Sequence, residues 1–174
     1  MVKNNLKNTI EDYLLKNSEK IKINSKDIKK NDVFLSLKGQ SNHGNSYIDE
    51  AWNNGAKYII TDKKIKNHNK SILLVKSSNK FLLEFAKKKR NLYTGKVIGI
   101  TGSLGKTTLK EYLKFFLSIN HKVSASIKSY NNILGVSISL ANLNLKSDFA
   151  IFEIGTNNFN EIKKLTKIVL PQQV

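Results

Sequence analysis

Residues 97–108 read Val-Ile-Gly-Ile-Thr-Gly-Ser-Leu-Gly-Lys-Thr-Thr, an apolar run that turns through glycines into a Lys-Thr-Thr sequence. The apolar run predicts a buried strand, and the residues after it predict a helix. A glycine-containing turn between the two points backbone N–H groups at phosphate oxygens, and the helix N-terminus favours the same negative charge. Lys106 can supply a cation, and the Thr107 hydroxyl can ligate Mg²⁺. The stretch therefore predicts a loop that binds nucleotide phosphates, although a tight strand-to-helix connection would use the same residue types.

Around this loop, the sequence after residue 93 alternates between apolar runs and helical segments. We expect strands at 96–100, 122–126 and 148–154, and helices at 106–118, from about 131, and at 160–166. Near-continuous apolar strands between helices are typical of a parallel sheet that is covered on both faces. Three strands make a small sheet, so we expect this chain to be part of a larger molecule.

The sequence before residue 93 has shorter elements. We expect a helix at 4–16, strands at 21–23, 33–37, 57–61 and 71–75, and helices at 47–54 and after Ser78. The predicted fold class is α/β. A small N-terminal α/β domain, 1–92, is followed by the start of a P-loop parallel-sheet ATPase domain, 93–174, which is incomplete.

Composition excludes several classes of site and partner. The chain has no Cys and three His, so we expect neither disulfides nor a thiolate or histidine metal site, and any metal should be a hard ion held by oxygen. The net charge is +17, but Arg90 is the single Arg among 30 basic residues. Specific nucleic-acid readout depends on Arg, so we expect a solvated Lys-rich surface and no nucleic-acid partner. Without a signal peptide or a long apolar run, we expect a cytoplasmic protein that does not insert into membranes.

The form Thr-Gly-x-x-Gly-Lys-Thr-Thr resembles the loop of the Mur ligases, a family that makes amide bonds by phosphorylating a carboxylate with ATP. Residues 24–39, Asn-Ser-Lys-Asp-Ile-Lys-Lys-Asn-Asp-Val-Phe-Leu-Ser-Leu-Lys-Gly, and residues 41–62 are similar to the family's N-terminal patterns. Residues 130–136, Tyr-Asn-Asn-Ile-Leu-Gly-Val, and residues 149–157, Phe-Ala-Ile-Phe-Glu-Ile-Gly-Thr-Asn, resemble the branch that adds D-alanyl-D-alanine. The resemblance covers roughly residues 20–174.

The resemblance implies roles for particular residues. The nucleotide would contact the loop and one residue after the last strand: Thr101, Gly102, Ser103, Leu104, Gly105, Lys106, Thr107, Thr108 and Asn157. Lys106 and Glu153 would be catalytic, with Thr107 and Glu153 holding Mg²⁺. The other substrate would contact Ser25, Asn45, Asn131 and Asn132.

The residues themselves leave alternatives at two of these places. Glu153 ends an apolar strand, at the edge where parallel sheets bind ligands, but such a carboxylate can also cap a helix or pair with a surface Lys. Asn131 and Asn132 are also typical of turns and helix N-caps. Asn45 stands where the family has His, and Asn160 replaces a Gly, which Asn does better than most residues where the backbone is unusual.

The implied reaction uses ATP to phosphorylate the terminal carboxylate of UDP-N-acetylmuramoyl-tripeptide, after which the amine of D-alanyl-D-alanine attacks the acyl phosphate. Family members continue well beyond this segment, so we expect the chain alone to be inactive. We also expect the full-length enzyme to be a monomer. Three other interpretations stay open. They are another Mur-type ligase that adds a diamino acid, an unrelated P-loop NTPase, and a non-catalytic paralogue or basic binding module.

Overall fold

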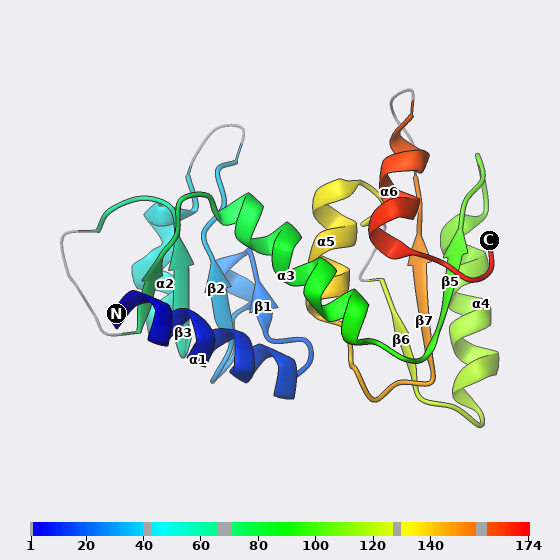
Figure 1. Cartoon of the computed structure of the whole chain (residues 1–174), viewed down its shortest axis with the longest axis horizontal. Coiled ribbons are helices and arrows are strands. Elements are labelled where there is room, and N and C mark those ends of the chain that lie inside the picture. Colours follow the sequence, from blue (N-terminus) through cyan, green and yellow to red (C-terminus); the bar gives the residue numbers. More distant parts are fainter. Residues whose placement is uncertain (1, 40–42, 66–70, 127–129, 156–159) are drawn as a thin grey trace. The chain divides into compact units, whose positions relative to one another are not determined.

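The computed structural model describes residues 2–39, 43–65, 71–126, 130–155 and 160–174, with side chains from Asn5 onward. The chain divides into two compact units, residues 1–82 and 83–174, and the division falls inside helix α3 (Ser78–Leu92). The boundary between functional domains at 92/93 stays a prediction. Both units alternate helices with parallel strands (Figure 1), which confirms the predicted α/β class.

The first unit is built on a four-stranded sheet in sequence order. Its strands are β1 (Ile21–Lys22), β2 (Val33–Leu35), β3 (Tyr58–Thr61) and β4 (Ile72–Leu74), all parallel. Its helices are α1 (Val2–Lys16), the 3₁₀ turns η1 (Ser25–Asp27) and η2 (Gly44–Tyr47), α2 (Ile48–Asn53) and the start of α3. Because the strands are parallel, the residues that follow β1, β2 and β3 all lie at the same edge of the sheet.

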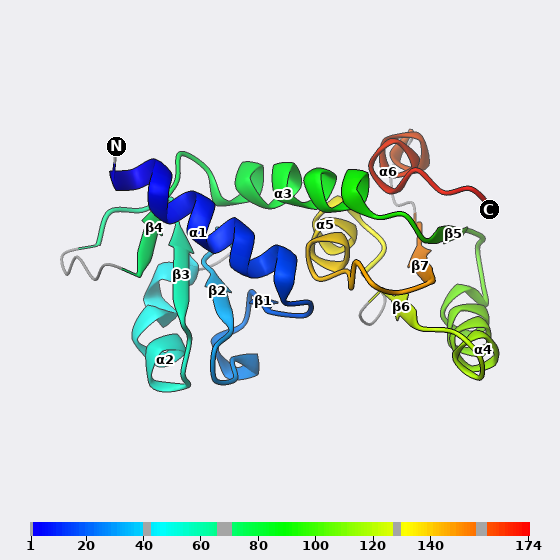
Figure 2. The ribbon, with the colours of Figure 1, turned by 60° about the horizontal axis from the view of Figure 1, so that its bottom comes forward.

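The first unit's core lies on both faces of this sheet. Helices α1 and α2 cover opposite faces (Figure 2), and the periodicity that predicted α1 corresponds to Ile10 and Leu14, which are buried. On the α2 face, Phe34 and Ile59 of the sheet pack with Ile48 and other apolar residues. The predicted helix at 47–54 is split between η2 and α2, because the His43 ring caps the 3₁₀ turn first by accepting from the Asn45 N–H.

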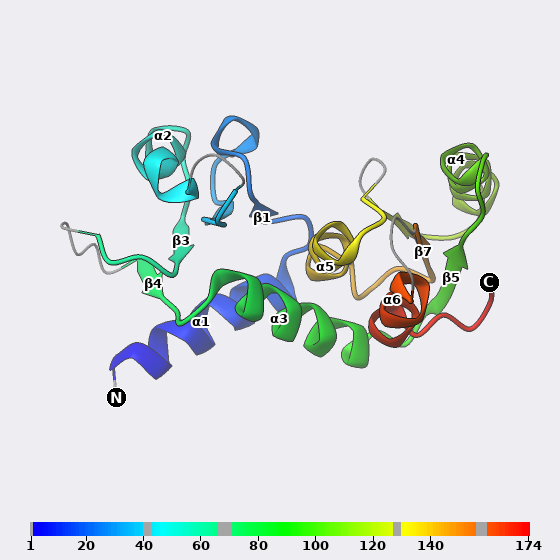
Figure 3. The same ribbon diagram turned by 90° about the horizontal axis from the view of Figure 1, so that it is seen from above.

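The second unit contains the loop at 101–105 and a three-stranded parallel sheet. Its elements are β5 (Lys96–Ile100), α4 (Lys106–Ser118), β6 (Val123–Ala125), α5 (Ile133–Ala141), β7 (Phe149–Glu153) and α6 (Glu161–Val169). The strand order is β5-β7-β6, so the last strand of the sequence is central. Helix α4 lies on one face, and α5 and α6 lie on the other (Figure 3), as the sequence predicts for a sheet with two covered faces.

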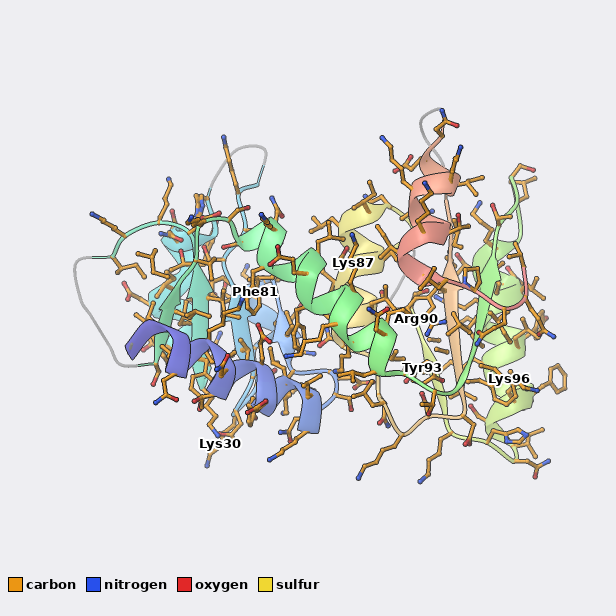
Figure 4. The ribbon with its side chains drawn as sticks, viewed as in Figure 1. Lys30, Phe81, Lys87, Arg90, Tyr93 and Lys96 are labelled. Atoms are coloured by element: carbon orange, nitrogen blue, oxygen red, sulfur yellow. The ribbon has the colours of Figure 1, made fainter. Side chains whose placement is uncertain are left out.

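Two basic residues near the end of α3 bind the C-terminal ends of other helices. Lys89 Nζ donates to the carbonyl of Ala141 in α5 over 3.0 Å. Arg90 donates through Nε to Val169 O and through Nη2 to Leu170 O, at 2.5 and 2.7 Å, and lies beside α6 (Figure 4). The carbonyls at a helix C-terminus lack intrahelical donors and carry partial negative charge, so both contacts satisfy groups that would otherwise be unpaired.

The residues after α6 run alongside β5. Gly99 N donates to Gln173 O and Gln172 N donates to Val97 O, at 2.8 and 2.9 Å. This parallel pairing covers part of the β5 edge.

Candidate functional site

The loop at 101–105 joins β5 to α4 and depends on its two glycines. Gly102 has φ of +144° and Gly105 has φ of +76°, backbone conformations that side-chain-bearing residues rarely adopt. Gly105 is the N-cap of α4 and is left-handed. A Cβ added there would meet no atom within 4 Å, so its backbone conformation, rather than crowding, calls for glycine. The loop thus presents an open surface at the positive end of a helix.

Lys106 lies over this loop. Its Nζ donates to Gly102 O at 2.5 Å and to Ser103 O at 3.3 Å. The ammonium is therefore held at the loop rather than extended into solvent, as a phosphate-neutralising group requires. Residues 101–105 are exposed, and the Leu104 side chain is 91% exposed.

Thr107 and Glu153 meet at the carboxyl edge of the sheet. Ile100 and Glu153 end the neighbouring strands β5 and β7 in register, so the loop and this carboxylate share one edge. Thr107 Oγ1 donates to Glu153 Oε2 over 3.0 Å. The sequence predicted this pair as joint Mg²⁺ ligands, and the structure brings the two side chains together.

Lys110 was not among the site residues predicted from the sequence. Its Nζ lies 2.8 Å from Glu153 Oε1, and both side chains are 1% exposed. The same ammonium donates to Ser126 O at 3.1 Å and lies 3.2 Å from Glu111 Oε1. Lys110 follows Thr107 by three residues, so the two share a helix face, and that spacing was the available signal. One alternative prediction for Glu153 was pairing with a surface Lys. The partner is indeed a Lys, but it is buried.

These residues fit a magnesium ion on chemical grounds. A hydroxyl and a carboxylate are the hard oxygen ligands that Mg²⁺ takes alongside phosphate oxygens. Glu153 Oε1 pairs with the Lys110 ammonium at 2.8 Å, and a carboxylate oxygen has two lone pairs, so one of them stays available. The described part of the chain contains no cluster of three or more His, Asp or Glu that could chelate a metal by itself.

The predicted substrate residues of the second unit have structural roles. Asn132 is the N-cap of α5, and its Oδ1 accepts from Gly135 N at 2.8 Å. The Asn131 carbonyl accepts from Gly155 N at 3.0 Å, and a Cβ at Gly155 would collide with the Asn131 side chain. The capping alternative is therefore present for Asn132, and substrate contact stays a prediction for both residues. Asn157 lies outside the described residues.

In the first unit, Asn45 joins the ends of two strands. Its Oδ1 accepts from Ser36 Oγ, after β2, and from Thr61 Oγ1, at the end of β3, both at 2.6 Å. Ser25, which follows β1 on the same edge, is buried and donates to Glu50 Oε2 at 2.6 Å. Both predicted substrate residues therefore lie at the carboxyl edge, with the Ser25 hydroxyl and the Asn45 side-chain oxygen engaged inside the protein.

His43 and Asp62 form a hydrogen bond in the same unit; His43 Nδ1 accepts from the Asn45 N–H, so the ring proton lies on Nε2 and is donated to Asp62. His43 Nε2 lies 2.9 Å from Asp62 Oδ1, and Ser78 N donates to Asp62 Oδ2 at 3.0 Å. Burial alone would raise the pKa of the Asp62 carboxyl. The hydrogen bonds from Ser78 and His43, with the electrostatic attraction of the His43 ring, outweigh burial and lower that pKa below its usual value. His43 was predicted only as part of a segment, so its pairing with Asp62 is new.

Two family profiles match the chain in succession. The profile described as "Mur ligase family, catalytic domain" matches residues 18–90, and "Mur ligase middle domain" matches residues 100–174. The chain belongs to the Mur ligase family. The resemblance carried by the loop and the later motifs is therefore confirmed.

Relatives of this Mur ligase chain are similar along most of its length. It is 40% identical over 156 residues to UDP-N-acetylmuramoyl-tripeptide--D-alanyl-D-alanine ligase from Rickettsia prowazekii, covering 89% of this chain and 34% of that enzyme. It is 32% identical to the ligase of the same name from Haemophilus influenzae, over 88% of this chain and 34% of the relative. The chain thus spans about a third of the length of the curated relatives it matches.

Solved structures agree with this placement. The MurF ligase from Thermotoga maritima, solved in complex with ADP, matches with a TM-score of 0.72 and 35% identity, over 91% of this chain and 36% of that one. A MurF structure from Acinetobacter baumannii matches with a TM-score of 0.74 and 32% identity, over 87% of this chain and 33% of its own.

Of the helices in the described parts of the chain, none is long and apolar enough to cross a membrane.

Proposed function

We propose that this Mur ligase chain binds ATP with Mg²⁺ at the loop of its second unit, as part of a cytoplasmic enzyme. That enzyme adds D-alanyl-D-alanine to UDP-N-acetylmuramoyl-tripeptide during synthesis of the peptidoglycan precursor. The observation that carries the proposal is the meeting of the Thr107 hydroxyl with Glu153 beside a loop over which Lys106 is already placed. The first relatives, named for this reaction, favour it over addition of a diamino acid.

The chain's own residues provide the parts that phosphoryl transfer needs, which are mainly positioning and electrostatics. Backbone N–H groups at the start of α4 bind phosphate oxygens. Lys106 moves from the loop carbonyls of Gly102 and Ser103 to the β- and γ-phosphates and spreads their charge. Thr107 and Glu153 hold Mg²⁺, which neutralises charge on the γ-phosphoryl group when bound.

In the proposed reaction, the terminal carboxylate of the tripeptide attacks the γ-phosphorus and ADP leaves. The amine of D-alanyl-D-alanine then attacks the acyl phosphate, which forms the amide and releases phosphate. We assign the uridine nucleotide to the carboxyl edge of the first sheet, near Ser25 and Asn45. The amine site lies outside this chain, so we propose that residues 1–174 bind both nucleotides without completing the ligation.

The proposal is tested by titrating the 174-residue chain with Mg·ATP and, separately, with the UDP-muramoyl tripeptide in a calorimeter. We expect Lys106→Ala to abolish Mg·ATP binding and to leave binding of the uridine nucleotide and the circular dichroism spectrum unchanged. Lys114→Ala is the matched control, because Lys114 is an exposed Lys of the same helix. Unchanged Mg·ATP binding by Lys106→Ala would refute the proposal.

A different P-loop NTPase would show no affinity for the UDP-muramoyl peptide. A basic module that captures polyanions would show steeply salt-dependent binding that survives Lys106→Ala, because counterion release depends on the whole basic surface. These two outcomes separate the proposed ligase from the alternatives that the sequence left open.

A further inference from the structure

Lys110 is a buried cation in a position where the proposed function also places a cation. Its Nζ is 2.8 Å from Glu153 Oε1, while Thr107 Oγ1 is 3.0 Å from Glu153 Oε2. One oxygen of the carboxylate therefore contacts an ammonium and the other contacts a predicted magnesium ligand. A fixed positive charge lies next to the metal position before any metal arrives.

The ammonium is held from three elements. It belongs to α4, donates to Ser126 O just after β6, and pairs with Glu153 at the end of β7. The Glu153 N–H in turn donates to Ser126 Oγ at 3.3 Å. Lys110 thus fixes the carboxylate in position relative to the loop. A Lys buried to 1% exposure loses its hydration, which is tolerated only when such partners replace it.

The charges of this cluster bear on how magnesium can enter. The buried charges of Lys110 and Glu153 cancel, and Glu111, the other carboxylate on the ammonium, is largely exposed to solvent. Free Mg²⁺ would meet one carboxylate that is already neutralised, one hydroxyl, and a repelling ammonium. Magnesium dehydrates reluctantly and needs strong oxygen ligands, and the described residues provide no acidic cluster to supply them.

We propose that Lys110 is a positioning residue and built-in counter-ion that stands in for the metal charge at Glu153. It keeps Glu153 oriented in the nucleotide-free protein and makes the site accept Mg²⁺ only together with nucleotide phosphates. The phosphates bring the negative charge that the paired carboxylate no longer offers. This inference rests on the proposed magnesium nucleotide site and adds the order in which its charges are assembled.

The test measures the thermal unfolding of the 174-residue chain with MgCl₂ alone, against KCl of equal ionic strength, at mildly alkaline pH. We expect no specific shift for the unaltered chain. Lys110→Met leaves Glu153 without its buried partner, so Mg²⁺ alone should then raise the midpoint. The shift of Lys110→Met should be half-maximal at an MgCl₂ concentration about tenfold or more below the highest one at which the unaltered chain shows no shift, since Mg²⁺ now replaces the lost charge.

Three controls separate this effect from a general loss of packing. Lys110→Met combined with Glu153→Gln removes both charges and should abolish the response to Mg²⁺. Lys110→Arg keeps a cation and should behave as the unaltered chain does. Glu111→Gln removes the exposed carboxylate that contacts the same ammonium. Like the unaltered chain, this variant should show no response to Mg²⁺.

Equal responses of Lys110→Met and the unaltered chain would overturn the proposal. If Lys110→Met folds only when Mg²⁺ is present, the proposal is supported. If Lys110→Met fails to fold both with and without Mg²⁺, Lys110 is only a structural ion-pair partner and the proposal is wrong. Mg·ADP binding to the unaltered chain is measured in the same series. Its absence would refute the proposed function itself, whereas its presence with an unresponsive Lys110→Met would refute only the counter-ion role.

Discussion

The Thr107 hydroxyl donates to Glu153 Oε2 over 3.0 Å and so joins the first turn of α4 to the last residue of β7. The two residues are 46 positions apart in the sequence, and parallel pairing of β5 with β7 brings them to one edge. The contact therefore places the loop and the carboxylate side by side at this edge of the sheet.

Removing this hydroxyl should weaken binding of Mg·ADP more than binding of ADP in EDTA. Thr107→Val keeps the shape of the side chain and removes the oxygen. We expect a loss of about 1.5–3 kcal/mol, roughly ten- to a hundredfold in affinity, since the hydroxyl contacts charged groups. Thr107→Ser retains the oxygen and should bind normally. Calorimetric titration with and without Mg²⁺ checks this, and an equal loss in both conditions would show that Thr107 serves only the loop.

Gly105→Ala should destabilise the second unit through backbone conformation. The residue has φ of +76° and open space around a Cβ, so the cost is the strain of a left-handed alanine, about 1–2 kcal/mol. Because that strain falls on the N-cap of α4, nucleotide affinity should fall with it. Gly55→Ala, at φ of +96° in the first unit, is the comparison and should leave Mg·ADP affinity unchanged. Urea unfolding and ADP titration of both variants test the expectation, and a fully stable Gly105→Ala would contradict it.

The sequence predicted the elements around the loop well, because their signals are local. Apolar runs marked β5 and β7, and the glycine loop marked the start of α4 at Lys106. Asn160 has φ of +64°, as the replacement of a family glycine by Asn led us to expect. The strands of the first unit are shorter than predicted, because each strand stops where its hydrogen bonding to the neighbouring strand stops. Sequence periodicity carries no information on where that pairing stops.

The buried cations could not be predicted in the same way. Lys is almost always solvent-exposed, so Lys89 and Lys110 appear in the sequence as members of a Lys-rich surface. Their burial depends on acceptors far away in the chain, Ala141 for Lys89 and Glu153 for Lys110. The single Arg, Arg90, likewise binds carbonyls about 80 residues away. Such contacts follow from the tertiary fold, and the sequence alone offered only the helical spacing of Thr107 and Lys110.

Lys89 should make the stability of the second unit pH-dependent. Burial lowers the pKa of its amine from 10.5 to about 8. Between these values the unfolded chain binds more protons than the folded chain does, so stability rises with pH from about 8 to about 10.5. Relative to Lys89→Met, the unaltered chain should gain about 1–3 kcal/mol across this window. Urea unfolding at both ends of the window measures the change.

The control for Lys89 is Lys87→Met, on the same helix and exposed. We expect its stability difference from the unaltered chain to stay constant over the same pH range. A difference between Lys89→Met and the unaltered chain that does not change with pH would mean that the Lys89 amine is hydrated in the folded protein. The hydrogen bond to Ala141 would then be formed at the surface of the unit.

Asn45 should contribute to the stability of the first unit as an acceptor. Its Oδ1 accepts from the hydroxyls of Ser36 and Thr61, both fully buried, so Asn45→Leu leaves two buried donors without this partner. We expect a loss of about 1–3 kcal/mol in the urea unfolding of the first unit. Asn53→Ala, at an exposed position of α2, is the control and should change stability by less than about 0.5 kcal/mol.

Asn45→Asp separates this structural role from the predicted contact with the uridine nucleotide. The carboxylate can accept from the same two hydroxyls, so the unit should stay folded and close to its original stability. It also adds a negative charge at the carboxyl edge of the sheet and removes the side-chain N–H donors, so affinity for an anionic nucleotide should fall if Asn45 faces that ligand. A folded Asn45→Asp that binds the UDP-muramoyl tripeptide unchanged would assign Asn45 to the fold alone. The uridine contact would then have to come from other residues at the carboxyl edge.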